Sequence, residues 1–100
     1  MQSERLTLPA LDRLIASLAR EAVVDEIWLY GSRARGDASE RADIDLAVRA
    51  PRATDRQWIA IQDLVEEAET LLPIDLVRLE RAPQSLATVI AAEGRKLYER

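Results

Sequence analysis

Three aspartates are the residues of this sequence whose spacing could support chemistry. Asp43 and Asp45 alternate with apolar residues, and Asp75 lies inside a second apolar stretch. Because alternate residues of a strand point to the same side of a sheet, we expect Asp43 and Asp45 to share one face. Two like charges this close disfavour each other's ionised form unless a cation or an arginine compensates. The pair therefore indicates either a solvent-exposed edge strand or a cation site.

The third aspartate adds a second strand to this pattern. A carboxylate in the apolar run of residues 74–77 is costly unless it is paired or bound to a metal. Taken alone, Asp75 is explained by an ion pair with an arginine. Taken with Asp43 and Asp45, three carboxylates meeting across adjacent strands could hold two divalent cations. Two such ions can clamp the attacking and leaving oxygens of a phosphoryl or nucleotidyl transfer.

A Gly-Ser pair precedes the aspartates and could bind the phosphates of such a reaction. Gly31 and Ser32 directly follow an apolar run. Glycine lets a ligand approach the backbone closely, and the serine hydroxyl and neighbouring amides can donate to phosphate oxygens. A simple turn explains the pair equally well when it is considered alone. Arg33 could neutralise triphosphate charge or could pair with a nearby acid, and the sequence leaves both open.

The composition excludes many other chemistries. The chain has 100 residues with no cysteine and no histidine, and 18 acidic against 14 basic residues give a formal net charge of −4. There is no disulfide framework, no thiolate nucleophile, no Ser-His-Asp triad and no imidazole metal ligand. A metal would have to be a hard cation bound by oxygen, Mg²⁺ or Mn²⁺ before zinc or copper. The acidic balance argues against direct nucleic-acid binding.

Helices must alternate with strands to position these residues. The polar stretch 31–41 is expected to be a loop with room for one helical turn. The first helix has Thr7 as its N-cap, a capping box at Thr54 opens the second, and the last turns Val89 inward. The expected helices are Pro9 to Glu21, Thr54 to about Leu71 and Pro83 to Glu93. The expected strands are Ile27–Tyr30, Asp43–Val48, Ile74–Val77 and an edge strand at Arg95–Glu99.

These elements predict an α/β (α+β) fold, with a small mixed sheet covered by helices in a single domain over residues 1–100. The chain is long enough to bury a core. Its N-terminus lacks the pattern of a signal peptide, and its longest uncharged run is too short for a membrane span. We therefore expect a soluble cytoplasmic protein that does not contact a membrane.

The combined motif resembles a known signature. Residues 31–36, Gly-Ser-Arg-Ala-Arg-Gly, followed by Asp43-Ile44-Asp45-Leu46, are similar to the signature of the DNA polymerase beta-like nucleotidyltransferases, and in particular of the MntA-like minimal nucleotidyltransferases. The resemblance implies that family's fold. It also implies nucleotide binding at Gly31, Ser32 and Arg33, and metal binding and catalysis by Asp43, Asp45 and Asp75. Ala42 departs from relatives that often carry Ser there.

The resemblance also implies a reaction and a partner. Minimal nucleotidyltransferases are commonly paired with a HEPN-domain toxin and transfer AMP from ATP to one of its tyrosines. For this chain it implies an antitoxin that uses ATP or another nucleoside triphosphate and two Mg²⁺ ions, with Mn²⁺ as an alternative, and that forms a hetero-oligomer with the toxin. Asp45 or Asp75 could help to deprotonate the nucleophile. The competing hypothesis is a non-catalytic binding module that neutralises its partner by contact.

Overall fold

The computed structural model describes residues 2–37, 43–68, 70 and 72–100, with side chains from Pro9 onward. Its elements alternate much as the sequence predicts. In chain order they are α1 (Gln2–Ala19), β1 (Glu26–Tyr30), α2 (Ser32–Arg35), β2 (Ile44–Arg49), α3 (Asp55–Glu66), β3 (Ile74–Arg78), a 3₁₀ turn η1 (Leu79–Arg81), α4 (Gln84–Glu93) and β4 (Arg95–Glu99).

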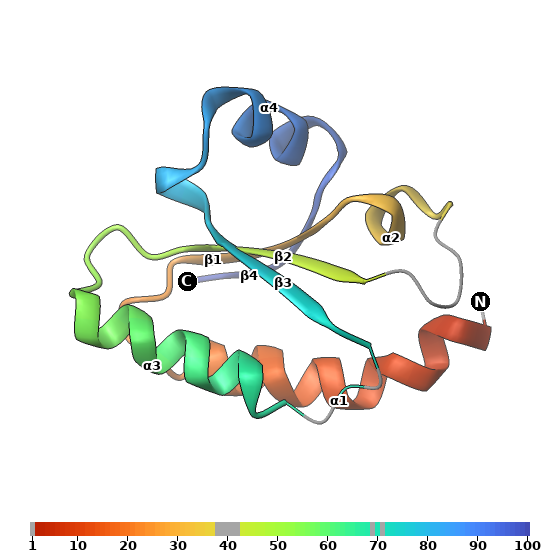
Figure 1. Ribbon diagram of the computed structural model, residues 1–100, viewed down its shortest axis with the longest axis horizontal. Coiled ribbons are helices and arrows are strands. Elements are labelled where there is room, and N and C mark those ends of the chain that lie inside the picture. Colours follow the sequence, from red (N-terminus) through yellow and green to blue (C-terminus); the bar gives the residue numbers. More distant parts are fainter. Residues whose placement is uncertain (1, 38–42, 69, 71) are drawn as a thin grey trace.

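The four strands form one mixed sheet with the order β3-β2-β1-β4. β1 runs antiparallel to both of its neighbours, whereas β2 and β3 are parallel and are joined through α3. Figure 1 shows α1 and α3 side by side on one face of this sheet and α4 on the other. The predicted mixed sheet covered by helices is confirmed, and β4 is the expected edge strand.

The hydrophobic core lies between the sheet and the two helices α1 and α3. Strand β1 alternates, with Ile27 and Leu29 buried and their neighbours half-buried. β2 contributes alternate residues to the same layer, and α1 presents an apolar stripe at helical spacing. These buried residues are Leu11, Leu14, Leu18, Ile44, Leu46 and Val48. The opposite face of the sheet, which carries α4, mixes apolar residues such as Trp28 and Ala47 with polar ones.

Helix α3 begins as predicted and ends earlier. The Thr54 hydroxyl accepts from the Gln57 N–H at 3.1 Å, and the Gln57 side chain accepts from the Thr54 N–H at 2.8 Å. The helix ends at Glu66 rather than near Leu71, which lies outside the described residues. The residues between Glu66 and Ile74 are needed to bring the chain from the end of α3 back to the start of β3. There the Pro73 carbonyl accepts from the Ile44 N–H at 2.9 Å, which fixes the parallel pairing of β3 with β2.

Helix α1 begins earlier than predicted. It starts at Gln2, so Thr7 and Pro9 are inside the helix and the prediction of Thr7 as the N-cap is wrong. Residues 2–6 contain good helix formers and no glycine, so propensity extends the helix toward the N-terminus. Pro9 costs one backbone hydrogen bond without ending the helix. The C-terminal end falls at Ala19, two residues before the predicted Glu21.

Helix α4 covers the other face of the sheet alone. Ile90 is buried against the sheet, but Val89 is 41% exposed, so the prediction that Val89 points inward is wrong. Each helical residue turns by about 100°, and a helix lying alone on a sheet buries only its central stripe. Val89 therefore lies on a flank of α4.

Within the described residues, no helix combines the length and the apolar character needed to cross a membrane.

Candidate functional site

One row of side chains across three strands forms the centre of the candidate site. Tyr30 of β1 pairs with Asp45 of β2, and Asp45 pairs with Asp75 of β3. Directly paired residues point to the same face of a sheet, with Cβ atoms about 4.5–5.5 Å apart. Their neighbours Ile44 and Leu46 are fully buried on the face covered by α1 and α3. Tyr30, Asp45 and Asp75 therefore share the face that carries α4.

The Gly-Ser turn lies directly against this row. Gly31 has φ 75° and ψ −157°, a conformation that is essentially restricted to glycine. A Cβ atom at Gly31 would overlap the Asp45 Oδ2 atom. The predicted phosphate-binding turn and the predicted metal-binding carboxylate are thus brought together. Glycine is required here both by its backbone angle and by the close approach of Asp45.

Helix α2 is a single turn between two glycines. The Gly31 carbonyl accepts from the N–H groups of Ala34 and Arg35, both at 3.1 Å. Gly36 ends the turn in the left-handed region with φ 84°. This confirms the one helical turn expected in the polar stretch. The turn begins with Ser32, whose N–H is among those that a helix leaves without an intrahelical acceptor.

The two arginines of α2 have different positions. Arg33 follows Ser32 in this turn and is half-buried. Arg35 at its end pairs with Asp37 at 3.2 Å and with Glu93 of α4 at 3.5 Å. Arg35 therefore connects α2 to α4.

The electrostatics of the row favour a cation. Burial and the negative charges of Asp75 and Asp43 raise the pKa of the Asp45 carboxyl above its usual value. Burial and the charges of Asp45 and Asp75 likewise raise the pKa of the Tyr30 phenol. Burial is the larger cause of both shifts, and the negative charge of the neighbouring aspartates adds to it. A divalent cation bound by carboxylate oxygens would offset that charge.

The two outer aspartates are more accessible than Asp45. Asp43 is exposed directly before β2 begins, and Asp75 is exposed because β3 is an edge strand. The cost that the sequence suggests for burying Asp75 therefore does not arise. Asp45 and Asp75 are paired across the sheet, and Asp43 acts on Asp45 through its charge. Ala42 lies outside the described residues.

These carboxylates are not assembled into a finished metal centre. In the part of the chain that the structure describes, no three histidine, cysteine, aspartate or glutamate side chains form a group that could hold an ion. The donor set nevertheless fits Mg²⁺ or Mn²⁺, because it consists of carboxylate oxygens, which are the ligands that hard divalent cations prefer.

Tyr30 is the residue of this row that the sequence analysis misses. It directly precedes Gly31, and its phenol responds to the charges of Asp45 and Asp75. The signal that could have found it is the alternation of β1: with Ile27 and Leu29 buried, Tyr30 must point to the opposite face.

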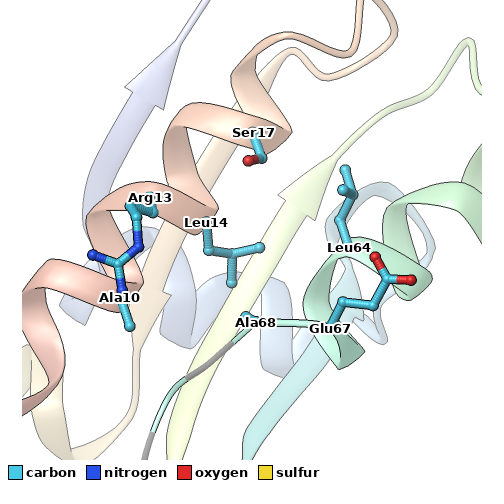
Figure 2. Close-up of a pocket in the computed structure, with 7 residues that line it drawn as sticks. All are labelled: Ala10, Arg13, Leu14, Ser17, Leu64, Glu67 and Ala68. Carbon is cyan, nitrogen blue, oxygen red and sulfur yellow. The ribbon is translucent and has the colours of Figure 1, made fainter.

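A pocket elsewhere in the molecule is separate from this row. This pocket has a volume of about 310 Å³. Its lining includes Arg13 and Ser17 of α1, Leu64 of α3 and Glu67 at the end of α3 (Figure 2). It lies between two helices that cover the opposite face of the sheet from Asp45. The candidate site is therefore the aspartate row beside α2.

Comparisons with solved structures give similar chains. A toxin-antitoxin structure with AMP-PNP is 27% identical with a TM-score of 0.66, and the match covers 88% of this chain and 73% of that chain. A toxin-antitoxin MntA-HepT structure is 26% identical with a TM-score of 0.59, covering 88% and 69% of the two chains.

A third solved structure adds a chemical modification. It is a tri-AMPylated Shewanella oneidensis HEPN toxin in complex with an MNT antitoxin, 25% identical with a TM-score of 0.64, covering 93% of this chain and 72% of that chain. No curated protein matches the chain. The family described as polymerase beta, nucleotidyltransferase, matches residues 12–100. This match covers most of the sequence and includes Gly31, Ser32 and all three aspartates, so the chain belongs to the polymerase beta nucleotidyltransferase family.

Proposed function

We propose that this chain transfers AMP from ATP to a tyrosine of a HEPN-domain toxin and so acts as its antitoxin. Two observations support the proposal: similarity to antitoxin structures, among them one with AMP-PNP and one with an AMPylated toxin, and the family assignment. We expect the reaction to take place in the cytoplasm, where ATP and the toxin are both available.

The observation that carries the proposal is the contact between Gly31 and Asp45. It joins a backbone turn that can bind phosphate to a carboxylate row that can bind cations. In the proposed complex, Gly31, Ser32 and Arg33 bind the phosphates, while Asp43, Asp45 and Asp75 hold two Mg²⁺ ions. Bound Mg²⁺ would supply charge neutralisation at the oxygens of the reacting phosphate.

The chain's own residues then act by orientation and by proton transfer. The toxin's tyrosine oxygen attacks the α-phosphorus of ATP, the new O–P bond forms, and the bond to pyrophosphate breaks. A carboxylate of the row, Asp45 or Asp75, takes the phenolic proton in this proposal. Ser32 and the Gly31 backbone hold the leaving phosphates in place. The row's exposed edge at Asp75 leaves room for the acceptor.

The proposal is tested with purified protein, a HEPN-domain toxin from the same organism, Mg²⁺ and α-labelled ATP. Label should move to the HEPN-domain protein and should be lost with Asp45→Asn or Asp43→Asn. Asp63→Asn is the matched control, because Asp63 is exposed on α3 far from the row. If the wild type transfers no label with any nucleotide but still neutralises the toxin, neutralisation by contact is the correct function.

A further inference from the structure

Tyr30 is the member of the row to which the proposed function gives no role. It is the last residue of β1 and pairs with Asp45 of β2. The next residue along the chain is Gly31, and consecutive Cα atoms lie about 3.8 Å apart. Tyr30 therefore borders both the carboxylate row and the turn that is proposed to bind phosphate.

The side chain of Tyr30 lies on the face of the sheet where α2 and α4 meet. Tyr30 shares this face with Asp45, as paired residues of neighbouring strands do. The last residues of α2 and α4, Arg35 and Glu93, form an ion pair at 3.5 Å. The phenol is half-buried there, and the charges of Asp45 and Asp75 act on it.

The hydroxyl of Tyr30 is available to a ligand. In the part of the chain that the structure describes, no residue accepts a hydrogen bond from this hydroxyl. No buried polar side-chain atom of the described residues lacks a partner, so an unpartnered Tyr30 hydroxyl must be reached by solvent. Tyr30 therefore presents an open O–H donor beside Asp45.

The position of this donor favours the nucleotide over the acceptor. The acceptor is expected at the exposed edge of the row at Asp75, on the far side of β2 from Tyr30. Tyr30 instead adjoins the Gly31 turn, where the proposed function places the leaving phosphates. Phosphate oxygens are charged acceptors, to which hydrogen bonds are stronger than between neutral groups. An uncharged O–H donates to them without repulsion.

We propose that Tyr30 is a nucleotide-binding residue whose hydroxyl donates a hydrogen bond to an oxygen of the leaving phosphates. This inference rests on the proposed function and adds a donor to those of Gly31 and Ser32. The bond holds the leaving group on the side of Asp45 that is away from Asp75, where the acceptor enters. Attack and departure on opposite sides of the phosphorus are the arrangement that an in-line displacement needs.

The test removes this hydroxyl with Tyr30→Phe, which keeps the aromatic ring and its packing. Tyr98→Phe is the matched control, because Tyr98 is the other tyrosine of the chain, lies on β4 and packs against the hydrophobic core. Calorimetry with Mg²⁺ measures the Kd of AMP-PNP and of pyrophosphate for the wild type and both variants. The transfer assay gives the KM for the HEPN-domain toxin, and thermal unfolding gives the melting temperatures.

We expect Tyr30→Phe to weaken binding of both AMP-PNP and pyrophosphate by about tenfold, the size of a lost hydrogen bond to a charged group. The KM for the toxin and the melting temperature should stay unchanged, and Tyr98→Phe should bind both ligands as the wild type does. Unchanged affinity of Tyr30→Phe for either ligand, a higher KM for the toxin alone, or the same loss with Tyr98→Phe would each overturn the assignment.

The same measurements separate this inference from the proposed function. A wild type that binds AMP-PNP but transfers no AMP to the toxin would refute the proposed function, while the two Kd values still decide whether Tyr30 contacts the phosphates. A wild type that binds neither AMP-PNP nor pyrophosphate would refute both.

Discussion

At the scale of single residues, the candidate site depends on contacts between side chains far apart in the sequence. Asp45 touches the backbone of Gly31, and its partner across the sheet is Asp75. Neither contact is an ion pair that would stabilise the fold. Burial and the charges of Asp75 and Asp43 raise the pKa of the Asp45 carboxyl, so ionised Asp45 costs stability, which is typical of residues that serve binding or catalysis.

Replacing the Asp45 carboxylate with a neutral amide should relieve its cost in folding stability. Because the pKa of Asp45 is raised in the folded protein, this carboxyl loses its proton at a lower pH in the unfolded chain than in the folded protein. The free energy of unfolding therefore falls as pH rises from the unfolded-state pKa to the folded-state pKa. We therefore expect Asp45→Asn to raise the melting temperature or leave it unchanged at pH 7 in metal-free buffer. The difference should shrink as pH approaches 4. A clear loss of stability would instead make Asp45 part of a structural ion pair.

Mg²⁺ should reverse the order of the melting temperatures of the wild type and Asp45→Asn. Adding Mg²⁺ with AMP-PNP should raise the melting temperature of the wild type, since a ligand that binds only the folded state stabilises it. Asp45→Asn should respond less. The same scan on Asp63→Asn, which leaves the row intact, gives the reference shift. Equal shifts in all three proteins would contradict a role for Asp45 in metal binding.

The two glycines around α2 give a second residue-scale prediction. Gly31→Ala should destabilise the fold by about 1–3 kcal/mol for its backbone angle, with a further cost because the new Cβ overlaps the Asp45 carboxylate. Gly36→Ala, with nothing within 4 Å of its Cβ position, should cost only about 1–2 kcal/mol for its positive φ. Denaturant unfolding measures both, and transfer activity should be lost only with Gly31→Ala.

At the scale of elements, a buried arginine holds the parallel strand pair to the following loop. Arg78 at the end of β3 donates to the carbonyls of Ala50 at 2.9 Å and Ala53 at 3.0 Å, and its guanidinium lies 5.1 Å from the Trp58 ring. Glu80 in η1 accepts from Arg78 and from the Ala50 N–H. This network keeps β3 in register with β2, and so keeps Asp75 opposite Asp45.

Breaking the network of Arg78 and Glu80 should lower the free energy of unfolding. Burial acts to raise the pKa of Glu80, but the Ala50 N–H and the Arg78 guanidinium outweigh it and hold that pKa below its usual value. Arg78→Met leaves Glu80 without this partner and should cost about 3 kcal/mol of unfolding free energy. Arg81→Met, at an exposed position of η1, should change little. Adding Glu80→Leu to Arg78→Met should recover part of the loss, and a further loss would contradict the pairing.

At the scale of the whole molecule, net charge decides which partners are attracted. A formal charge of −4 on 100 residues repels the phosphate backbone. We expect labelled single-stranded and duplex DNA to show no change in fluorescence anisotropy with this protein at tens of micromolar in about 150 mM salt. A salt-dependent binding curve in that range would show that the chain carries a basic surface, contrary to this expectation.

The sequence by itself determined the chemistry and most of the elements. The absence of histidine and cysteine limits the site to oxygen ligands, and the motif from Gly31 to Leu46 carries the family signature. The capping box at Thr54 and the alternation in β1 are local signals, and both are confirmed. Such features are readable because they depend on residues near each other in the chain.

Only the tertiary structure decided how these parts meet. The pairing of Asp45 with Asp75 depends on a parallel register fixed by contacts between distant residues, and the exposure of Asp75 depends on β3 being an edge strand. Tyr30 joins the row for the same reason, and Val89 is exposed because α4 lies alone on its face. Strand order and register come from long-range packing, which local propensity does not encode.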